Sequence, residues 1–146
     1  MERKSSPGPA PLWVPVRGHA LRCAGIHFDA VRITGVAGER VACEIIRFTG
    51  FDAGPIVRSG VGERGMYFLL PPQSANVYRW PVGAEVMSRG GRTAAFVGVP
   101  ALRGPTWPLD WRSPPTAGTP FVDAELLHGL TVDVLVEGAG GCPAGS

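Results

Sequence analysis

The sequence contains few of the residues that build disulfide frameworks, metal clusters or membrane spans. It has three cysteines, Cys23, Cys43 and Cys142, and no two of them form a C-x-x-C pair. An odd number of scattered cysteines does not make a disulfide framework and is typical of a reducing compartment, so we expect a cytoplasmic protein. No apolar run approaches the ~20 residues that a membrane helix needs, and we therefore expect no membrane partner.

Lysine is almost absent, since Lys4 stands against thirteen arginines, and the net charge is only +2. So small a charge does not by itself indicate nucleic acid. The arginines are concentrated, however: residues 53–118 hold seven of them with three acids, whereas the chain from Thr119 onward has four acids and no base. An arginine-rich middle could contact phosphates, and an ordinary solvated surface is the alternative.

The length predicts a single domain with loose ends. Four prolines within residues 1–18 predict a disordered arm, in which Trp13 and Val14 can fold back onto the body. Residues 19–137 form the predicted domain, and the glycine-rich residues 138–146 a flexible tail.

The hydrophobic pattern predicts several short elements. β-branched and aromatic residues indicate a strand over 26–33, and the spacing of Val41, Ile45 and Phe48 indicates a helix over 39–49. Residues 130–136 alternate like a strand, with a continued helix as the alternative. The remaining elements are strands at 56–58, 66–70, 85–87 and 93–99, a long loop at 100–120, and a helix at 121–128. Together they predict an α+β (or α/β) fold with a small mixed β-sheet and one or two packed helices.

Residues 55–72, PIVRSGVGERGMYFLLPP, contain a formal G-x-G-x-x-G at 60–65. A dinucleotide-binding loop requires a helix directly after such glycines. The residues that follow are instead a strand signal ending at Pro71, so the segment predicts a β-hairpin. Its backbone N–H groups, with Arg58 and Arg64, could still bind a phosphate.

An acid and two tryptophans are further candidates. Asp29 lies among apolar residues of the first predicted strand, where a carboxylate needs an arginine, a metal or backbone donors. A structural ion pair with Arg32 or Arg92 is the alternative to a catalytic role. Trp107 and Trp111 lie in the long loop, where they can stack on bases or cover a sheet edge.

In the order and spacing of these segments, the chain resembles the N-terminal domain of bifunctional DNA primase/polymerases, in the archaeo-eukaryotic primase superfamily. The likeness covers about residues 25–115 and rests on HFDAVRI, RSGVGERGMYFLLPP, GAEVMSRGG with AAFVGVP, and WPLDWRSPP. These segments are similar to the family's first core strand, its glycine-rich hairpin, the strand with its third acid and the strand after it, and its closing tryptophan loop. The resemblance implies a primase/polymerase-like core, a role in DNA replication, and single-stranded DNA or nucleotide as a partner.

The chain departs from this family at the residues that carry its chemistry. The family's carboxylates hold two divalent metal ions, which clamp a nucleoside triphosphate. Asp29 lacks the second acid of the family's acid-x-acid pair because Val31 follows it, and Gly65 stands where the family's hairpin has histidine. Asp29 and Glu85 remain as the candidates for catalysis and for binding Mg or Mn. The resemblance thus implies a catalytically inactive domain, and a residual metal-dependent nucleotidyltransferase is the alternative.

The implied nucleotide or nucleic-acid contacts combine arginines, small hairpin residues and the two loop tryptophans. A small regulatory protein-interaction module is the alternative function, keeping only the scaffold and using the 107–111 loop against a protein partner. The implied binding residues are Arg58, Ser59, Gly60, Gly62, Arg64, Arg89, Arg92, Trp107 and Trp111.

Overall fold

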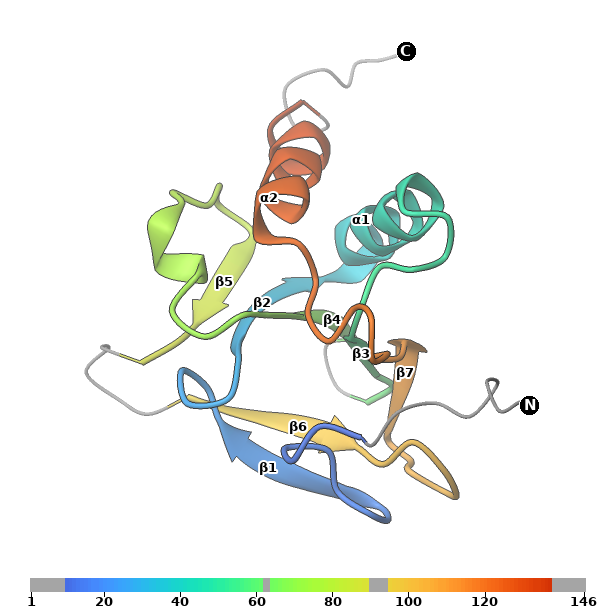
Figure 1. Cartoon of the computed structure of the whole chain (residues 1–146). Helices are drawn as coiled ribbons and strands as arrows, with labels where there is room; N and C mark the ends of the chain where they lie inside the picture. Colours follow the sequence, from blue (N-terminus) through green and yellow to red (C-terminus); the bar gives the residue numbers. More distant parts are fainter. Residues whose placement is uncertain (1–9, 62–63, 90–94, 138–146) are drawn as a thin grey trace.

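A computed structural model of the chain describes residues 10–61, 64–89 and 95–137 (Figure 1). No helix among these residues is long and apolar enough to cross a membrane. The elements, in chain order, are β1 (His19–Cys23), β2 (Asp29–Thr34), α1 (Gly35–Phe48), β3 (Ile56–Ser59), β4 (Gly65–Leu70), the 3-10 turn η1 (Ala75–Val77), β5 (Ala84–Met87), β6 (Phe96–Pro100), β7 (Leu109–Ser113), α2 (Ala124–Val132) and the π-helical turn η2 (Asp133–Glu137).

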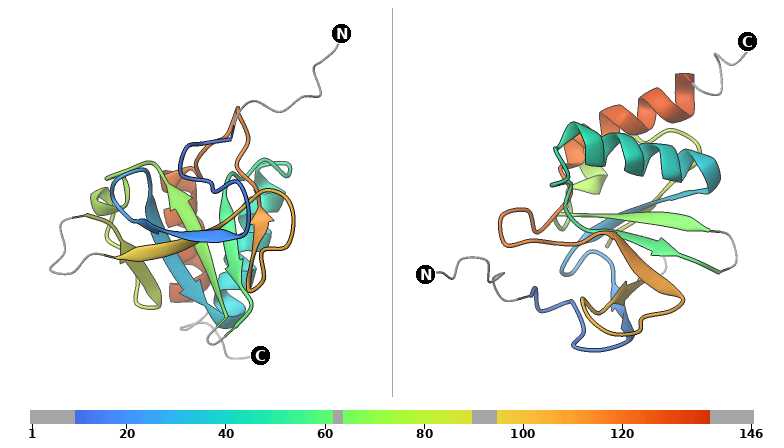
Figure 2. Two further views of the ribbon diagram at one scale, coloured as in Figure 1. Left: turned by 90° about the horizontal axis from the view of Figure 1, so that it is seen from below. Right: turned by 90° about the vertical axis from the view of Figure 1, so that its right-hand side faces the viewer.

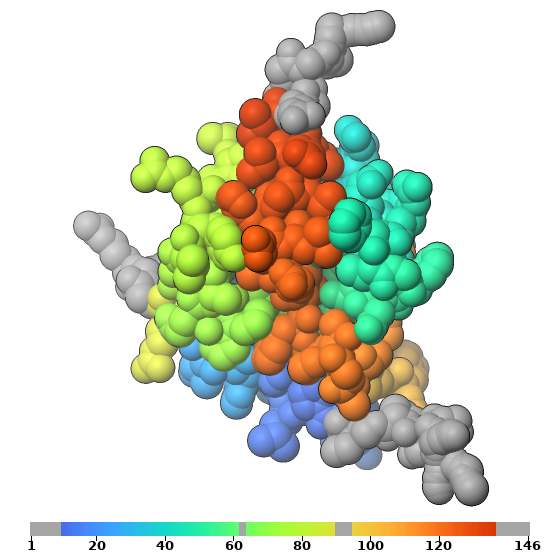
Figure 3. Space-filling model, turned by 45° about the horizontal axis from the view of Figure 1, so that its top comes forward, coloured from blue at the N-terminus to red at the C-terminus, as the bar shows by residue number. Residues whose placement is uncertain are grey.

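Three layers make up the molecule. A five-stranded sheet of order β5-β2-β4-β3-β7 lies between the two helices and a two-stranded sheet, β1-β6 (Figure 2). Helix α2 lies between α1 and the η1–β5 segment on the outer helical face (Figure 3). The predicted α+β class is confirmed. The mixed sheet is not found, because every strand pairing among the described residues is antiparallel.

Strand β2 contributes to two hydrophobic cores, one on each face of the central sheet. Val31 and Ile33 are buried against the helices, whereas Ala30 is buried on the side of β1 and β6. Successive side chains of a strand point to opposite faces, so a strand covered on both sides is apolar at consecutive positions. This explains why the sequence of β2 does not alternate cleanly between apolar and polar residues.

The predicted hairpin is confirmed, since Ser59 of β3 pairs with Gly65 of β4. Helix α1 begins at Gly35, four residues before its predicted start at residue 39. It packs closely on β2 at Gly38, where an added Cβ would lie 2.1 Å from the carbonyl oxygen of Ile33. The first helical turn therefore depends on a glycine that propensity alone disfavours within a helix.

The C-terminal helix also differs from its prediction. It begins after Asp123, whose side chain accepts a hydrogen bond from the Leu126 N–H at 3.0 Å, instead of at residue 121. An aspartate that accepts from N3 in this way satisfies one of the unpaired amides of the first turn. The helix then runs to Val132 and continues as a π-helical turn, so the strand predicted over 130–136 is wrong and its helical alternative is right.

The described part of the N-terminal arm belongs to the folded body. Trp13 and Val14 are buried, which confirms that they fold back. The Trp13 ring lies 5.1 Å from that of Phe28 and 6.2 Å from that of Phe121, measured between ring centroids. The disordered arm predicted for residues 1–18 is therefore wrong from at least Trp13 onward.

Candidate nucleic-acid interface

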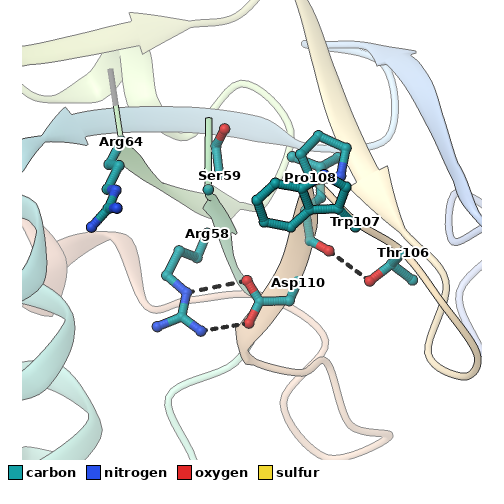
Figure 4. A pocket seen from close by; sticks show the side chains of 9 residues that line it. Arg58, Ser59, Arg64, Thr106, Trp107, Pro108 and Asp110 are labelled. Atoms are coloured by element: carbon teal, nitrogen blue, oxygen red, sulfur yellow. Dashed lines mark hydrogen bonds and ion pairs between the residues drawn. The ribbon is translucent and has the colours of Figure 1, made fainter. Parts of the chain in front are cut away.

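Five of the predicted binding residues meet at one cleft. The cleft has a volume of about 450 Å³ and lies between the β3–β4 hairpin and the segment that leads into β7 (Figure 4). The cleft is lined by two arginines, one tryptophan and one aspartate, together with small and apolar residues. The lining residues are Arg58, Ser59, Gly60, Arg64, Thr106, Trp107, Pro108, Leu109 and Asp110.

Trp107 is the most exposed aromatic residue of this cleft, with 74% of its surface accessible. Its segment is fixed to the hairpin by a 2.8 Å hydrogen bond from the Gly60 N–H to the Pro108 carbonyl. The indole packs on the backbone of Gly60, because a Cβ at this position would lie 3.0 Å from the ring atom Cζ3. The Thr106 hydroxyl closes the turn by donating to the Leu109 carbonyl at 2.6 Å. A large aromatic surface is thus held in place and left open to solvent.

Arg58 is held by a bidentate ion pair across two strands. Its partner is Asp110, which lies opposite it in the β3–β7 register. Nε donates to Oδ1 at 3.1 Å and Nη2 donates to Oδ2 at 2.7 Å. These hydrogen bonds to Asp110 raise the pKa of Arg58 above its ordinary value, with a smaller contribution from the Glu39 charge. A guanidinium has five N–H donors, so Arg58 remains a cation with donors left for a phosphate.

Arg64 directly precedes β4 and is exposed. Its carbonyl accepts a 3.0 Å hydrogen bond from the Gly35 N–H, which ties the hairpin to the start of α1. Among the described residues, its side chain has no ion-pair partner. The side chains of Arg58 and Arg64 extend to the same side of the hairpin in Figure 4.

The two arginines also line a second cleft, of about 500 Å³, on the α1 side of the hairpin. This cleft contains Glu39, whose carboxylate lies 3.6 Å from Nε of Arg112. Arg58 and Arg64 thus lie between two adjoining hollows. Arg58 is paired with Asp110, whereas Arg64 has no acidic partner among the described residues. The same two arginines line both hollows.

Two other predicted contacts lie away from this cleft. Arg89 follows β5, at the opposite edge of the central sheet, and its backbone lies against Gly25. Trp111 is half-buried against the core under β1 and β6, and its indole N–H donates to the Ala101 carbonyl at 3.1 Å. Gly62 and Arg92 lie outside the described residues. The structure therefore separates the two predicted tryptophan contacts, one exposed and one structural.

Asp29 is fully buried, and its carboxylate accepts hydrogen bonds from two donors. Its Oδ2 accepts from the Ala75 N–H at 3.0 Å, and its Oδ1 accepts from the Ser88 hydroxyl at 2.7 Å. The carboxylate thereby ties β2 to the first residue of η1 and to the residue after β5. Among the described residues, its partners are a backbone amide and a hydroxyl, not the Arg32 weighed from the sequence; Arg92, the other partner weighed, lies outside them.

Glu85 lies on the other face of the sheet from Asp29. It is opposite Arg32 in the β2–β5 register, and its Oε1 lies 3.1 Å from Nη1 of that residue. Cross-strand partners share a face, and residues three apart in a strand point to opposite faces, so Asp29 and Glu85 cannot coordinate one ion. Mg or Mn needs several oxygen ligands, and within the described ranges no three His, Cys, Asp or Glu residues are grouped. Asp29 and Glu85 therefore do not fit the metal-dependent catalytic centre that was the alternative from the sequence.

The sequence did not indicate that Asp110, Thr106 and Pro108 belong to the cleft. Their segment reads as a loop, and only the β3–β7 pairing brings Asp110 opposite Arg58. Comparisons with protein-family models, with curated proteins and with solved structures found no match for this chain.

Proposed function

We propose that this domain binds single-stranded nucleic acid in the cleft between the β3–β4 hairpin and the Trp107 segment. The observation that carries the proposal is an exposed indole, 74% accessible, in the same cleft as Arg58 and Arg64. Base stacking on an aromatic ring combined with phosphate contacts from arginine is the usual basis of sequence-tolerant single-strand binding. The resemblance to primase/polymerase domains supports the same ligand class.

A single strand suits this cleft better than a duplex. The indole can stack only on a base whose face is free, and bases within a duplex are already stacked on their neighbours. The volume of about 450 Å³ is in the range of small-ligand sites, which are ~300–1,000 Å³. The cleft therefore accommodates one nucleotide unit at a time, with its phosphate toward Arg58 and Arg64.

The proposed activity is binding without polymerase chemistry. The two candidate carboxylates each have a structural partner. Asp29 accepts from the backbone of η1, and Glu85 forms an ion pair with Arg32. Their separation by the sheet leaves no pair to hold the two metal ions that in-line nucleotidyl transfer uses.

Fluorescence anisotropy of labelled oligothymidylate tests the proposal. Two phosphate contacts on a single strand predict a log–log salt slope of about −1.4, so the Kd should rise about sevenfold between ~50 mM and ~200 mM salt. The double variant Arg58→Gln/Arg64→Gln should lose most of this salt dependence and bind at least tenfold more weakly at low salt.

The double variant Arg17→Gln/Arg79→Gln is the matched control, because it removes the same charge from exposed positions outside the cleft. It should bind like the wild type. If both double variants bound equally weakly, the affinity would depend only on net charge, and the proposed site would be refuted. A nucleoside triphosphate that binds as tightly as the oligonucleotide would instead make free nucleotide the ligand.

A further inference from the structure

Another open hollow lies on the helical face, and it shares no lining residue with the two clefts of Arg58 and Arg64. It is a groove of about 530 Å³ between the end of α1 and the outer side of α2. Its apolar part consists of Phe48 from α1 and Leu126 and Leu130 from α2. Phe48 is 72% exposed, although Val41, Ala42, Ile45 and Ile46 of the same helix are buried. A large aromatic ring left this open beside other apolar side chains is typical of an interaction surface.

The rim of this groove is acidic. Asp123, Glu125 and Asp133 all line it, and all three are exposed. From Asp123, the steps to Leu126, to Leu130 and to Asp133 are three, four and three residues, so these side chains share one side of the helix. The apolar strip is therefore flanked by carboxylates at both ends. From Thr119 to the end of the sequence no lysine or arginine offsets them.

Gly129 makes the groove accessible at its centre. It lies on α2 four residues after Glu125, and a Cβ added there would meet no atom within 4 Å. The gap left by the missing side chain lies in solvent and is not filled by a neighbouring element. A ridge of side chains from another helix could enter this gap, as in ridges-into-grooves packing.

We propose that this groove docks an amphipathic helix of a partner protein that carries lysine or arginine beside its apolar stripe. We name the surface the acidic groove; it consists of Phe48, Leu126, Gly129 and Leu130, with the carboxylates of Asp123, Glu125 and Asp133. The apolar strip fits residues at i, i+4 and i+7 of such a helix, and the acidic rim fits its basic flanks. The surface differs from the nucleic-acid cleft in both position and charge.

A second copy of this chain is a poorer occupant of the acidic groove. A twofold dimer buries the same patch on both subunits. Here it would place the three carboxylates of one copy against those of the other, and like charges brought together oppose association. The charge pattern therefore selects a basic partner over self-association.

The test uses a fluorescein-labelled synthetic amphipathic helix with leucine at i, i+4 and i+7 and lysine on both flanks, and the same peptide with glutamate in place of lysine. We expect saturable binding of the lysine peptide and at least tenfold weaker binding of the glutamate peptide. Gly129→Tyr, which fills the groove, should weaken binding of the lysine peptide at least tenfold, whereas Gly129→Ala should leave it within twofold. Circular dichroism verifies that both Gly129 variants remain folded.

Neutralising the rim provides a second, charge-matched comparison. Glu125→Gln/Asp133→Asn should weaken binding at least fivefold. Leu21→Lys/Leu102→Lys changes the net charge by the same amount at exposed positions outside the groove and should have no effect. Absence of saturable binding, or equal affinity for wild type and Gly129→Tyr, overturns the proposal. A dimer in sedimentation that Gly129→Tyr dissociates would also overturn it, because the occupant would then be a second copy.

Discussion

Replacing Asp29 tests whether its carboxylate is structural. In the fold it accepts hydrogen bonds from the Ala75 N–H at 3.0 Å and the Ser88 hydroxyl at 2.7 Å, and it is fully buried. Hydrogen bonds to charged groups contribute ~1.5–3 kcal/mol each, so removing both would cost up to ~6 kcal/mol. Two effects reduce this cost: the buried charge is no longer desolvated, and the half-buried Ser88 hydroxyl, which still accepts from Asn76 at 3.3 Å, can donate to solvent instead.

The Ala75 N–H is then the main group left unsatisfied, and we expect Asp29→Ala to lower the free energy of unfolding by about 3 kcal/mol. At about 3 °C per kcal/mol for a chain of this size, the Tm should fall by about 9 °C. Asp29→Asn keeps an oxygen for Ala75 and an amide donor for Ser88, so its cost should be only about 1 kcal/mol.

Glu85→Gln is the matched comparison, because it removes a carboxylate from an ion pair whose acid is 59% exposed. Surface ion pairs contribute about 0–1 kcal/mol, and this variant should stay within that range. Thermal and urea unfolding followed by circular dichroism give the values. If Asp29→Ala were no more costly than Glu85→Gln, the carboxylate would not be part of the structural framework and the reasoning would be wrong.

Four further substitutions test the remaining interactions. Asp110→Asn should strengthen oligothymidylate binding by up to about fivefold, because Arg58 loses a competing anion worth ~0.2–1 kcal/mol; weaker binding in anisotropy would contradict this. Trp107→Ala should weaken binding about tenfold, because stacking contributes ~1–3 kcal/mol per base, and should leave the Tm unchanged. Trp111→Ala should instead lower the Tm without changing the affinity of the folded protein. Gly38→Ala should lower unfolding free energy by at least ~2 kcal/mol, because its Cβ would overlap the backbone of β2; an unchanged urea midpoint would show that α1 can move away.

The features that the sequence predicted well depend on local signals. The hairpin follows from a glycine turn between two apolar runs, the second of which is stopped by Pro71. The burial of Asp29 follows from its position two residues before Val31 in a strand. The sequence also indicates that Arg58 and Arg64 are exposed and line one cleft, because both flank the same turn.

The features that the sequence did not predict depend on contacts between distant segments. Strand β7 reads as a proline-rich loop until its pairing with β3 places Asp110 opposite Arg58, 52 residues earlier in the chain. Trp107 and Trp111 look equivalent in sequence, and only the β7 register turns Trp111 toward the core while leaving Trp107 exposed. Likewise, no local pattern indicates that the amide of Ala75 would meet a carboxylate of β2.

The most direct test of the nucleic-acid cleft is an NMR titration of ¹⁵N-labelled protein with oligothymidylate. Four indole N–H signals report on the four tryptophans, and only Trp107 lines the cleft. We predict large shift changes for the Trp107 indole and for the amides of Ser59 and Gly60, with little change at Trp13, Trp80 and Trp111. Saturable binding that leaves Trp107 and Gly60 unshifted, or no shift change at low salt, would contradict the proposed site.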